Sequence, residues 1–575
     1  MSARYSGPNG ANVLESRGMA VTKLKKIAVV SVLAVAPLAA GAYANRLDIL
    51  KYTLGWHTDI MHPRGPNMPV PWMAGPEAAQ QPLAQRPPNI ILILADDLGI
   101  NDVTTRGGGY AAQGAPTPNI DSIARDGVRF DQGYAGAAVC TVSRAALMTG
   151  RYPWRFGVEF TPTPGSMARV AAELYAAPGN LHPAIIDQDK AARSKQFNDL
   201  GMPASEQTIA ELLRPRGYHN IHIGKWHLGS TPEMRPNNQG FDESLFMESG
   251  LYLPVNSPDV VNSKQDFDPI DKFLWPNMRF GVSYNGGKWF EPSKYLTDYF
   301  TDEAVTAIRR NRNRPFFLYL AHWGVHTPLQ ASKADYDALP NIKDHRRRVY
   351  AAIVRSIDRS VGRVLQTLRE EGLDGNTIVI FTSDNGAPGY IGLPEVNRPY
   401  RGWKLTQFEG GVRVPYVARW PGHIPPGLQY QPPVSNIDLL PTLVAAAGGS
   451  LPGDRVIDGV NLLPFLTDKP AIQAERPLFW RDGPYRTLQE HGWKLIVSQR
   501  PQKNWLFNLN RDPTEKINLA AREPEKLAQM NAVLQAHHAQ MPPSLWPSFL
   551  EVAISIDKTL DQKQSPDDEF TYWSN

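Results

Sequence analysis

The chain has 575 residues, enough for one large domain with a smaller one beside it, because single hydrophobic cores rarely grow beyond about 250–300 residues. Hydrophobic residues make up 42% and charged residues 20%, and the mean hydropathy of −0.36 excludes a polytopic membrane protein. The formal net charge is only +4, with no long basic block after the N-terminal region, so nucleic acid is not an expected partner.

The first 44 residues have the pattern of a secretory signal peptide. Lysines between positions 23 and 26 precede an apolar run over residues 27–40, and residues 42–44 have the small-x-small form of a cleavage site. The run is shorter than the roughly 20 residues that a membrane-spanning helix needs. We therefore expect a signal peptide over residues 1–44 and a periplasmic or secreted protein, with an uncleaved membrane anchor as the alternative.

Residues 45–88 are rich in Pro, Gly and Gln with little periodicity, which indicates a tether or an arm that wraps around the body. From residue 89 onward, short apolar runs alternate with longer helical patterns, which is typical of α/β proteins. We expect a mostly parallel central sheet between two layers of helices, in a catalytic domain of residues 89–470. Its buried strands are expected over residues 90–95, 218–223, 316–320 and 377–381, with an amphipathic helix over residues 349–368.

The pattern changes after about residue 470. Isolated short strands are expected over residues 493–497 and 505–509, followed by a helix over residues 523–540. These elements predict a smaller α+β subdomain over residues 471–575.

Reactive side chains follow each of the four expected strands of the main sheet. Ligands of open α/β sheets bind beyond the carboxyl ends of the strands, so these side chains are expected to form one site. They are Asp96 and Asp97, Lys225 and His227, His322 and His326, and Asp384 and Asn385.

Asp96, Asp97, Asp384 and Asn385 together offer three carboxylates and an amide oxygen. Such a set suits a hard cation better than zinc, so we expect Ca²⁺, with Mg²⁺ as the alternative. Taken alone, an Asp pair could equally cap a helix or face solvent.

Cys140 is the only cysteine, so no intramolecular disulfide can form. A lone cysteine is most often a small buried hydrophobe. Here it begins a segment with good helix formers, which places it near a helix N-terminus, with Arg144 one turn further on. Both features favour anions and lower the pKa of a thiol, so an electropositive nucleophile pocket is expected.

The segment that starts at Cys140 resembles the signature of type I sulfatases, whose core is Cys-x-Pro-Ser-Arg followed by a helix and Thr-Gly-Arg. Further blocks are similar to those of the family and stand in the family's order between residues 89 and 520. They are NIILILADDLG, CTVSRAALMTGR, GKWHLG, HTP, SDNG, KLTQFEGGVRVP and LFNLNRDPTEKINLA. The resemblance implies the alkaline-phosphatase-like fold and hydrolysis of aryl or carbohydrate sulfate esters.

By this resemblance, a formylglycine-generating enzyme oxidises Cys140 to formylglycine, whose hydrate supplies an oxygen nucleophile and binds the metal. Asp384 would activate that hydrate, and Arg144 and Lys225 would steady it. His227 is similar to the family histidine that touches the hydrate, and His326 and Lys404 to the pair that assists the leaving alcohol. His322 matches a family site less clearly than these residues and is interpreted as a structural histidine.

Val142 stands where the family has Pro or sometimes Ala, within the sequence that the converting enzyme reads. Residues 160–205 and 251–294 carry few family blocks and are expected to shape the substrate mouth. In the second stretch, aromatic residues surround a turn at residues 285–287, which indicates a hairpin. Its rings could stack on a substrate or simply pack onto the body.

Two other functions fit the same residues. One is hydrolysis of phosphodiesters or phosphonate monoesters by a related enzyme of the alkaline-phosphatase superfamily. The other is non-catalytic binding of sulfated glycans, with formylglycine formation lost through Val142.

Overall fold

The computed structural model describes residues 45–110, 113–165, 167–168, 181–248, 250–467 and 475–575. The chain separates into two compact units, residues 1–61 and 62–575. In the first unit, the described part is the helix α2 (Arg46–Met61). No helix in the described residues is long and apolar enough to cross a membrane. The expected signal peptide over residues 1–44 lies outside them.

The helix α2 is an element that sequence analysis missed, because residues 46–61 fall inside the stretch interpreted as an irregular tether. The Pro-rich composition of that stretch begins only at Pro63, and residues 46–61 contain no proline and a single glycine, Gly55. The prolines and glycines of residues 62–88 dominate the average composition of residues 45–88, and this average therefore concealed the helix-forming composition of residues 46–61.

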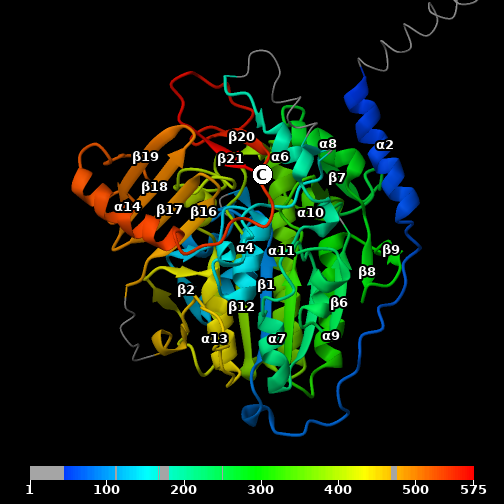
Figure 1. Ribbon diagram of the computed structural model, residues 1–575. Helices are drawn as coiled ribbons and strands as arrows, with labels where there is room; N and C mark the ends of the chain where they lie inside the picture. The colour runs from blue at the N-terminus through cyan, green and yellow to red at the C-terminus, as the bar shows by residue number, and fades with distance from the viewer. Residues whose placement is uncertain (1–44, 111–112, 166, 169–180, 249, 468–474) are drawn as a thin grey trace, which may run out of the picture. The chain divides into compact units, whose positions relative to one another are not determined.

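A ten-stranded sheet forms the centre of the second unit (Figure 1), in the order β14-β2-β13-β12-β1-β10-β5-β6-β8-β9. Its five middle strands, β12 to β6 in that order, run parallel, whereas the strands at both edges include antiparallel pairs. The middle strands match the four predicted ones and add β6; they are β12 (Thr377–Ser383), β1 (Asn89–Ala95), β10 (Phe316–Ala321), β5 (His219–Gly224) and β6 (Glu243–Met247). The edge strands are β14 (Leu428–Tyr430), β2 (Val128–Phe130), β13 (Tyr416–Arg419), β8 (Val282–Tyr284) and β9 (Trp289–Phe290).

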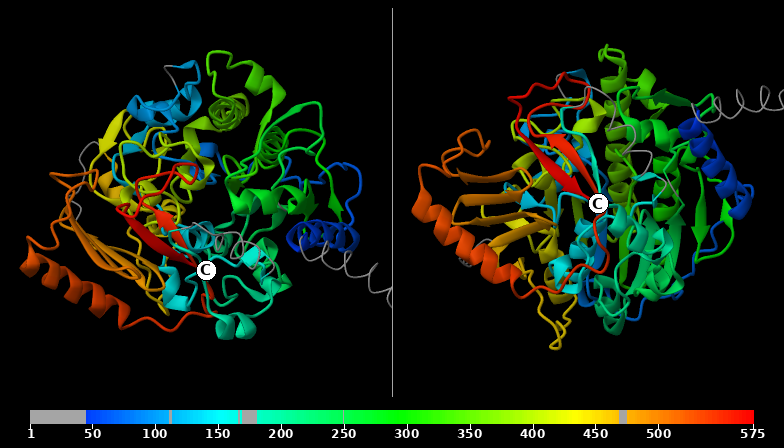
Figure 2. Two further views of the ribbon diagram at one scale, coloured as in Figure 1. Left: turned by 90° about the horizontal axis from the view of Figure 1, so that it is seen from above. Right: turned by 45° about the horizontal axis from the view of Figure 1, so that its top comes forward.

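Helices cover both faces of this sheet, as predicted (Figure 2). Alternate residues of β1 point to opposite faces, so Ile91 and Ile93 join one hydrophobic core and Ile90, Leu92 and Leu94 join the other. The first core includes α3 (Pro118–Arg125), α9 (Leu296–Arg310) and α11 (His345–Glu370). The second includes α4 (Cys140–Thr149), α7 (Ile209–Leu213) and α13 (Leu439–Ala446).

Residues 62–88 lie along the body as an arm. Gly65 pairs with Phe290 of the edge strand β9, and the Met73 amide donates to the Glu243 carboxylate at 2.7 Å. The hairpin β8–β9 forms at the predicted turn, with Asn285 and Gly286 at positive φ. Its Phe290 is buried in the core, so this ring packs onto the body and does not face a substrate.

The C-terminal region has its own antiparallel sheet beside the main one, with α14 (Pro524–His538) on its outer side (Figure 1). Leu495 and Leu506 of this sheet pack against Met530 and Leu534 of the helix. The strands are β16 (Leu478–Asp482), β17 (Tyr485–Glu490), β18 (Trp493–Gln499) and β19 (Gln502–Asn508).

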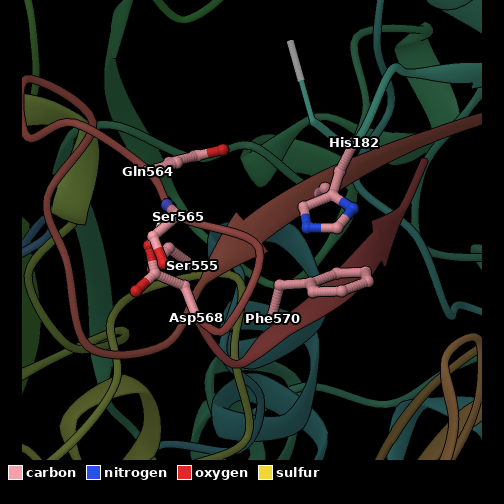
Figure 3. Close-up of a pocket in the computed structure, with 7 residues that line it drawn as sticks. His182, Ser555, Gln564, Ser565, Asp568 and Phe570 are labelled. Atoms are coloured by element: carbon pink, nitrogen blue, oxygen red, sulfur yellow. Dashed lines mark hydrogen bonds between the residues drawn. The ribbon is translucent and has the colours of Figure 1, made fainter.

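The last strands, β20 (Leu550–Ser555) and β21 (Phe570–Ser574), form a hairpin that is extended by β4 (Ile185–Ile186). Next to it, His182 stacks on Phe570 at 3.6 Å between ring centroids (Figure 3). The cavity there measures about 10 Å³, which is room for one water molecule and not for a substrate. The remaining helices and strands are short: α6 (Gln188–Arg193), α8 (Pro269–Asn277), α10 (Lys333–Asp337), α12 (Glu409–Val412), β3 (Gly133–Tyr134), β7 (Val260–Ser263), β11 (Leu329–Ser332) and β15 (Val434–Ser435).

Asp358 of α11 ties two helices together by capping α3. Its carboxylate accepts from the Asn119 and Ile120 amides at 3.0 and 2.9 Å, and burial raises its pKa to about 6. At pH 8, we expect Asp358→Ala to lower the free energy of unfolding by about 1–3 kcal/mol, because two N–H groups lose their acceptor. Urea denaturation followed by circular dichroism measures this. Glu370→Ala, at the exposed end of the same helix, should change it by under about 0.5 kcal/mol, and equal losses would contradict the cap.

Candidate active site

The carboxyl ends of four parallel strands meet at one rim of the main sheet, as predicted. The backbone there is joined directly: the Asp384 amide donates to Ala95 at 3.2 Å, and the Lys225 amide donates to Ala321 at 2.9 Å. Asp96 and Asp97 follow β1, and the start of α4 brings Cys140 beside them. Nine of the ten residues expected at the site are linked there by hydrogen bonds or ion pairs: Asp96, Asp97, Cys140, Arg144, Lys225, His326, Asp384, Asn385 and Lys404. The tenth, His227, lies near enough that, besides burial, the charges of Lys225 and Arg144 lower its pKa.

Asp96 joins the cysteine to a fixed cation. The Cys140 thiol lies 3.4 Å from one Asp96 oxygen and 3.8 Å from Asp97, and the Lys225 ammonium lies 2.5 Å from the other Asp96 oxygen. Lys225 also stands over the Trp323 ring, 4.8 Å from its centroid. The sulfur of residue 140 therefore faces both carboxylates that follow β1.

Asp97 adopts a left-handed backbone conformation, with φ of 64°, that turns the chain sharply after β1. Its carboxylate receives the Lys404 ammonium at 2.7 Å and the Asn385 side-chain amide at 2.7 Å. The Tyr390 hydroxyl donates to it at 3.3 Å, and the His326 ring nitrogen Nε2 lies 3.6 Å away. Asp97 thus gathers side chains from three separate segments of the chain.

Arg144 is fully buried and holds Asp384. Its Nε donates to Asp384 at 2.9 Å, and one terminal nitrogen donates to the Lys225 carbonyl at 2.9 Å and to the Tyr319 hydroxyl at 3.3 Å. The other terminal nitrogen lies 3.6 Å from Asp96 and has no hydrogen-bond partner. It is a charged donor available to an anion in the site.

The electrostatics of the rim is a balance between burial and neighbouring charge. Burial is the largest single effect and raises the pKa of a carboxyl group, but the surrounding basic groups together outweigh it and hold the pKa values of Asp96 and Asp97 below their usual range. Lys225, His326 and Arg144 act on Asp96, and Lys404, His326 and Lys225 act on Asp97. At Asp384, burial and the charge of Asp96 prevail over Arg144, so its pKa is raised. Asp384 is therefore the most basic of the three carboxylates.

One expectation about Cys140 is wrong. Its position at the helix N-terminus predicted a lowered thiol pKa, but burial raises the pKa of Cys140 well above its usual value, and the charges of Asp384 and Asp96 add to this effect. Lys225 and Lys404 act in the opposite direction without reversing it. The unmodified side chain is thus a neutral thiol, which is a weak nucleophile.

The histidines differ in their surroundings. Burial lowers the pKa of His326 to about 4 and that of His227 well below its usual value, so both rings are neutral at pH 7. The Nδ1 of His326 lies 2.7 Å from the Thr327 carbonyl, which accepts its proton, so Nε2 is the bare nitrogen that faces Asp97. His322 bonds to Ser360 of α11 at 2.9 Å, consistent with a structural role.

The rim has the ligand atoms that a cation needs. Ligand atoms of Asp96, Asp97, Cys140 and His326 all lie within 4.8 Å of one another. The Asn385 side-chain oxygen is buried without a hydrogen-bond partner, and an orphaned acceptor of this kind suits a cation. The two oxygens of Asp384 accept from Arg144 and from the Asp97 amide. Asp96, Asp97, Cys140, His326 and the free oxygen of Asn385 therefore fit a metal ion, and Asp384 lies beside this group.

Sequence analysis missed several residues that contact the site. Tyr390 and Tyr319 bond directly to Asp97 and Arg144, and the Trp323 ring packs against His326, tilted by 36°, at 4.1 Å between centroids. Ile554 and Trp573 of the C-terminal hairpin pack on a cluster formed by Ala137, Val139, Val142 and Leu405. Trp323, between His322 and His326, is the one whose sequence position signalled it, whereas Ile554 and Trp573 reach this cluster only through the tertiary fold.

Comparisons with known proteins agree with this geometry. Residues 88–450 match the family model described as Sulfatase, and residues 402–541 match the one described as N-sulphoglucosamine sulphohydrolase, C-terminal. Human N-acetylgalactosamine-6-sulfatase is 32% identical over 501 residues, which cover 80% of this chain and 87% of that protein. Mouse steryl-sulfatase is 31% identical over 569 residues, which cover 80% of this chain and 84% of that protein.

Among solved structures, the crystal structure of Ps i-CgsB superposes with a TM-score of 0.66 at 31% identity, covering 80% of this chain and 95% of that one. The matched family model spans more than half of the chain, and these relatives are matched over most of their own length. The chain therefore belongs to the sulfatase family and is a sulfuric ester hydrolase.

Proposed function

We propose that this sulfatase hydrolyses sulfate monoesters of carbohydrates or aryl alcohols through a formylglycine made from Cys140, next to a bound Ca²⁺. The observation that carries the proposal is the position of Cys140: it starts α4, 3.4 Å from Asp96, among three buried carboxylates and three buried cations. A neutral buried thiol has little use as a nucleophile there, whereas an oxygen nucleophile made from the same side chain would be well placed.

Asp96, Asp97, Asp384 and Asn385 would hold the cation, with the modified residue 140 as a further ligand and Mg²⁺ as the alternative ion. Without an ion, Arg144, Lys225 and Lys404 balance the three carboxylates. A divalent ion would add two positive charges to this balanced site, which would then attract an anionic ester. When bound, the ion supplies Lewis acid chemistry, polarising the oxygens that it contacts.

The hydrate of this formylglycine would supply an oxygen nucleophile. Loss of the proton of its second hydroxyl would re-form the aldehyde C=O and break the C–O bond to sulfate, which leaves without attack of water at sulfur. Asp384 is the group to take the proton of that nucleophile, because its pKa is raised and it lies near enough to residue 140 for its charge to add to burial in raising the pKa of the thiol there. The unpartnered terminal nitrogen of Arg144 and the Lys225 ammonium would orient the sulfuryl oxygens. His227, neutral and with an unpartnered Nδ1, would accept or return a proton of the hydrate.

The leaving alcohol needs compensation for the negative charge that develops on its oxygen. Asp97 raises the pKa of Lys404 well above its usual value despite burial, so Lys404 keeps its proton and acts as a fixed positive charge. His326, neutral and facing the same carboxylate, completes the pair on this side of the site. Loss of a group that stabilises developing charge in this way typically costs about 10²–10³-fold in kcat.

Relatives point to the class of alcohol. One is named for its action on N-acetylgalactosamine 6-sulfate, and Ps i-CgsB was also solved in complex with k-i-k-neocarrahexaose. We propose a carbohydrate sulfate as the natural substrate. We also propose a signal peptide or anchor over residues 1–44, a tether over 45–88 that begins with the helix α2, a catalytic domain over 89–470, a subdomain over 471–575, and a periplasmic or secreted location.

Conversion of Cys140 is the first test. We expect mass spectrometry of the peptide around residue 140 to show an aldehyde, and Cys140→Ala to abolish hydrolysis of 4-nitrophenyl sulfate. Val142→Pro should raise the converted fraction and leave the fold intact, because residue 142 lies in the first turn of α4, where the first helical bond is donated by Ser143. A fully active enzyme with an unmodified thiol would contradict the proposal, and greater activity on phosphodiesters or phosphonate monoesters would favour the related hydrolases.

Metal dependence is the second test. Chelation should abolish activity and lower the melting temperature, and Ca²⁺ should restore both, because an ion that binds only the folded state stabilises it. Asn385→Leu should raise the Ca²⁺ concentration for half-maximal activity by about 10- to 100-fold, as loss of a supporting group at a metal site does. Asn376→Leu is the matched control, a buried asparagine just before β12 that bonds to backbone carbonyls outside the site. Full activity in chelator would refute the metal assignment.

The role of Arg144 is the third test. Arg144→Lys keeps the charge but cannot reproduce the contacts to Asp384, Tyr319 and the Lys225 carbonyl together. We expect kcat/KM to fall by about 10- to 100-fold, since hydrogen bonds to charged groups contribute about 1.5–3 kcal/mol each. Arg155→Lys changes a similar forked pair with Asp458 away from the site and should leave kcat/KM within about twofold.

A further inference from the structure

The loop that carries Lys404 is held at both ends. On the site side, the Lys404 amide donates to Ala387 at 3.0 Å, and the Leu405 amide donates to Ala138, two residues before Cys140, at 2.9 Å. Leu405 has a φ of 77°, a conformation that a non-glycine residue keeps only where its surroundings impose it. The other end of the loop, residues 407–409, contacts the C-terminal sheet.

Residues 407 and 408 contact that sheet directly. The Gln407 side chain donates to the Tyr485 carbonyl at 3.1 Å and accepts from the Thr487 hydroxyl at 2.6 Å. The Phe408 ring packs edge-on against Trp505, 5.6 Å between centroids, in an apolar cluster with Ile496 and Phe507. The loop is therefore anchored in the interior of the subdomain by both hydrogen bonds and apolar packing.

A buried ion cluster lies immediately beyond. Lys494 of β18 is fully buried and bridges the carboxylates of Glu409 and Glu515, at 2.9 Å from each. The second Glu409 oxygen accepts from Arg413 and from the Tyr134 hydroxyl, both at 3.0 Å. The Glu409 amide donates to Glu515 at 2.7 Å, so the cluster fixes both the side chain and the backbone of Glu409.

Apolar packing alone could attach a subdomain, and Phe408 already provides it. Burial of ions is costly, and a buried ion pair often stabilises no more than apolar residues of the same size. Unlike apolar contacts, however, hydrogen bonds depend on direction. The bonds that Glu409 makes with the cluster therefore fix its carboxylate and its amide at the end of the loop. Lys494 has no exposed surface, so it cannot touch a substrate.

We propose that Lys494, with Glu515, Glu409 and Thr487, positions the Lys404 ammonium for the leaving alcohol, so that the C-terminal sheet takes part in the reaction. These residues are positioning residues that act through the Lys404 loop. The inference rests on the role proposed above for Lys404. It predicts that changes in the cluster weaken leaving-group assistance and leave the other steps unchanged.

The readout is the dependence of kcat on the leaving group. The full-length enzyme is assayed with 4-nitrophenyl sulfate, whose phenolate leaves easily, and with an alkyl or sugar sulfate, whose alkoxide needs assistance. Lys404→Met defines the full effect, which should be about 10²-fold or more on the poor leaving group and much smaller on the good one. Lys494→Met and Thr487→Val should reproduce part of this pattern, with at least about tenfold selective loss for Lys494→Met.

Leu506→Ala is the matched control. Leu506 neighbours Trp505 in β19 but packs on α14, on the face away from the loop, so its truncation weakens the subdomain without touching the cluster. It should change both substrates equally. Thr487→Val removes one hydrogen bond with little change of shape, and it decides the question if Lys494→Met does not fold.

The outcomes separate the two proposals. If Lys404→Met shows no selective loss on the poor leaving group, the role given to Lys404 in the proposed function fails. If Lys404→Met shows that loss but Thr487→Val and any folded Lys494→Met variant affect both substrates equally, the positioning role is overturned and the proposed function stands.

Discussion

The structure depends on the mutual neutralisation of three buried carboxylates by three buried cations at one rim of the sheet. Asp96, Asp97 and Asp384 could not be removed from water together unless Lys225, Lys404 and Arg144 came with them, because unpaired buried charges are strongly destabilising. The six side chains come from separate segments, so the balance is reached only when the parallel strands and the loops that follow them are in register. The same charges that limit folding also create the site.

This balance would let the rim accept both the cation and the sulfate ester proposed above. In the structure, Lys225 and Lys404 lie 2.5 and 2.7 Å from carboxylate oxygens that a metal ion would also use. An ion bound there would take over the neutralisation of Asp96 and Asp97, which frees the two ammonium groups for a sulfate ester. Metal binding and substrate binding would thus be coupled through Coulomb interactions over distances of a few ångströms.

The sequence was sufficient for features that depend on local pattern. The continuous apolar runs ending in Ala95, Ile223, Leu320 and Phe381 gave the strands of the central sheet, and the reactive residues after them met at one rim. The sequence was not sufficient for properties that depend on the surroundings of a side chain in the folded protein. The helix N-terminus suggested an acidic thiol, but desolvation by residues distant in sequence raises the pKa of Cys140. Tyr390 is likewise unremarkable in sequence and becomes a partner of Asp97 only through the fold.

The position of Lys404 indicates which parts of the chain contribute to the active site. Lys404 contacts Asp97 after β1, yet Glu409, five residues later, contacts Lys494 of the C-terminal sheet. Both family models cover residues 402–450, and the C-terminal one spans the segment from residue 402 to residue 541. That segment therefore includes Lys404, Glu409, Lys494 and Glu515 together. A sheet that supplied only stability would have no need of a fully buried lysine between two glutamates at its contact with the active site. The arrangement is more readily understood if the C-terminal sheet is the support of the leaving-group side, while the parallel sheet supports the nucleophile and the metal.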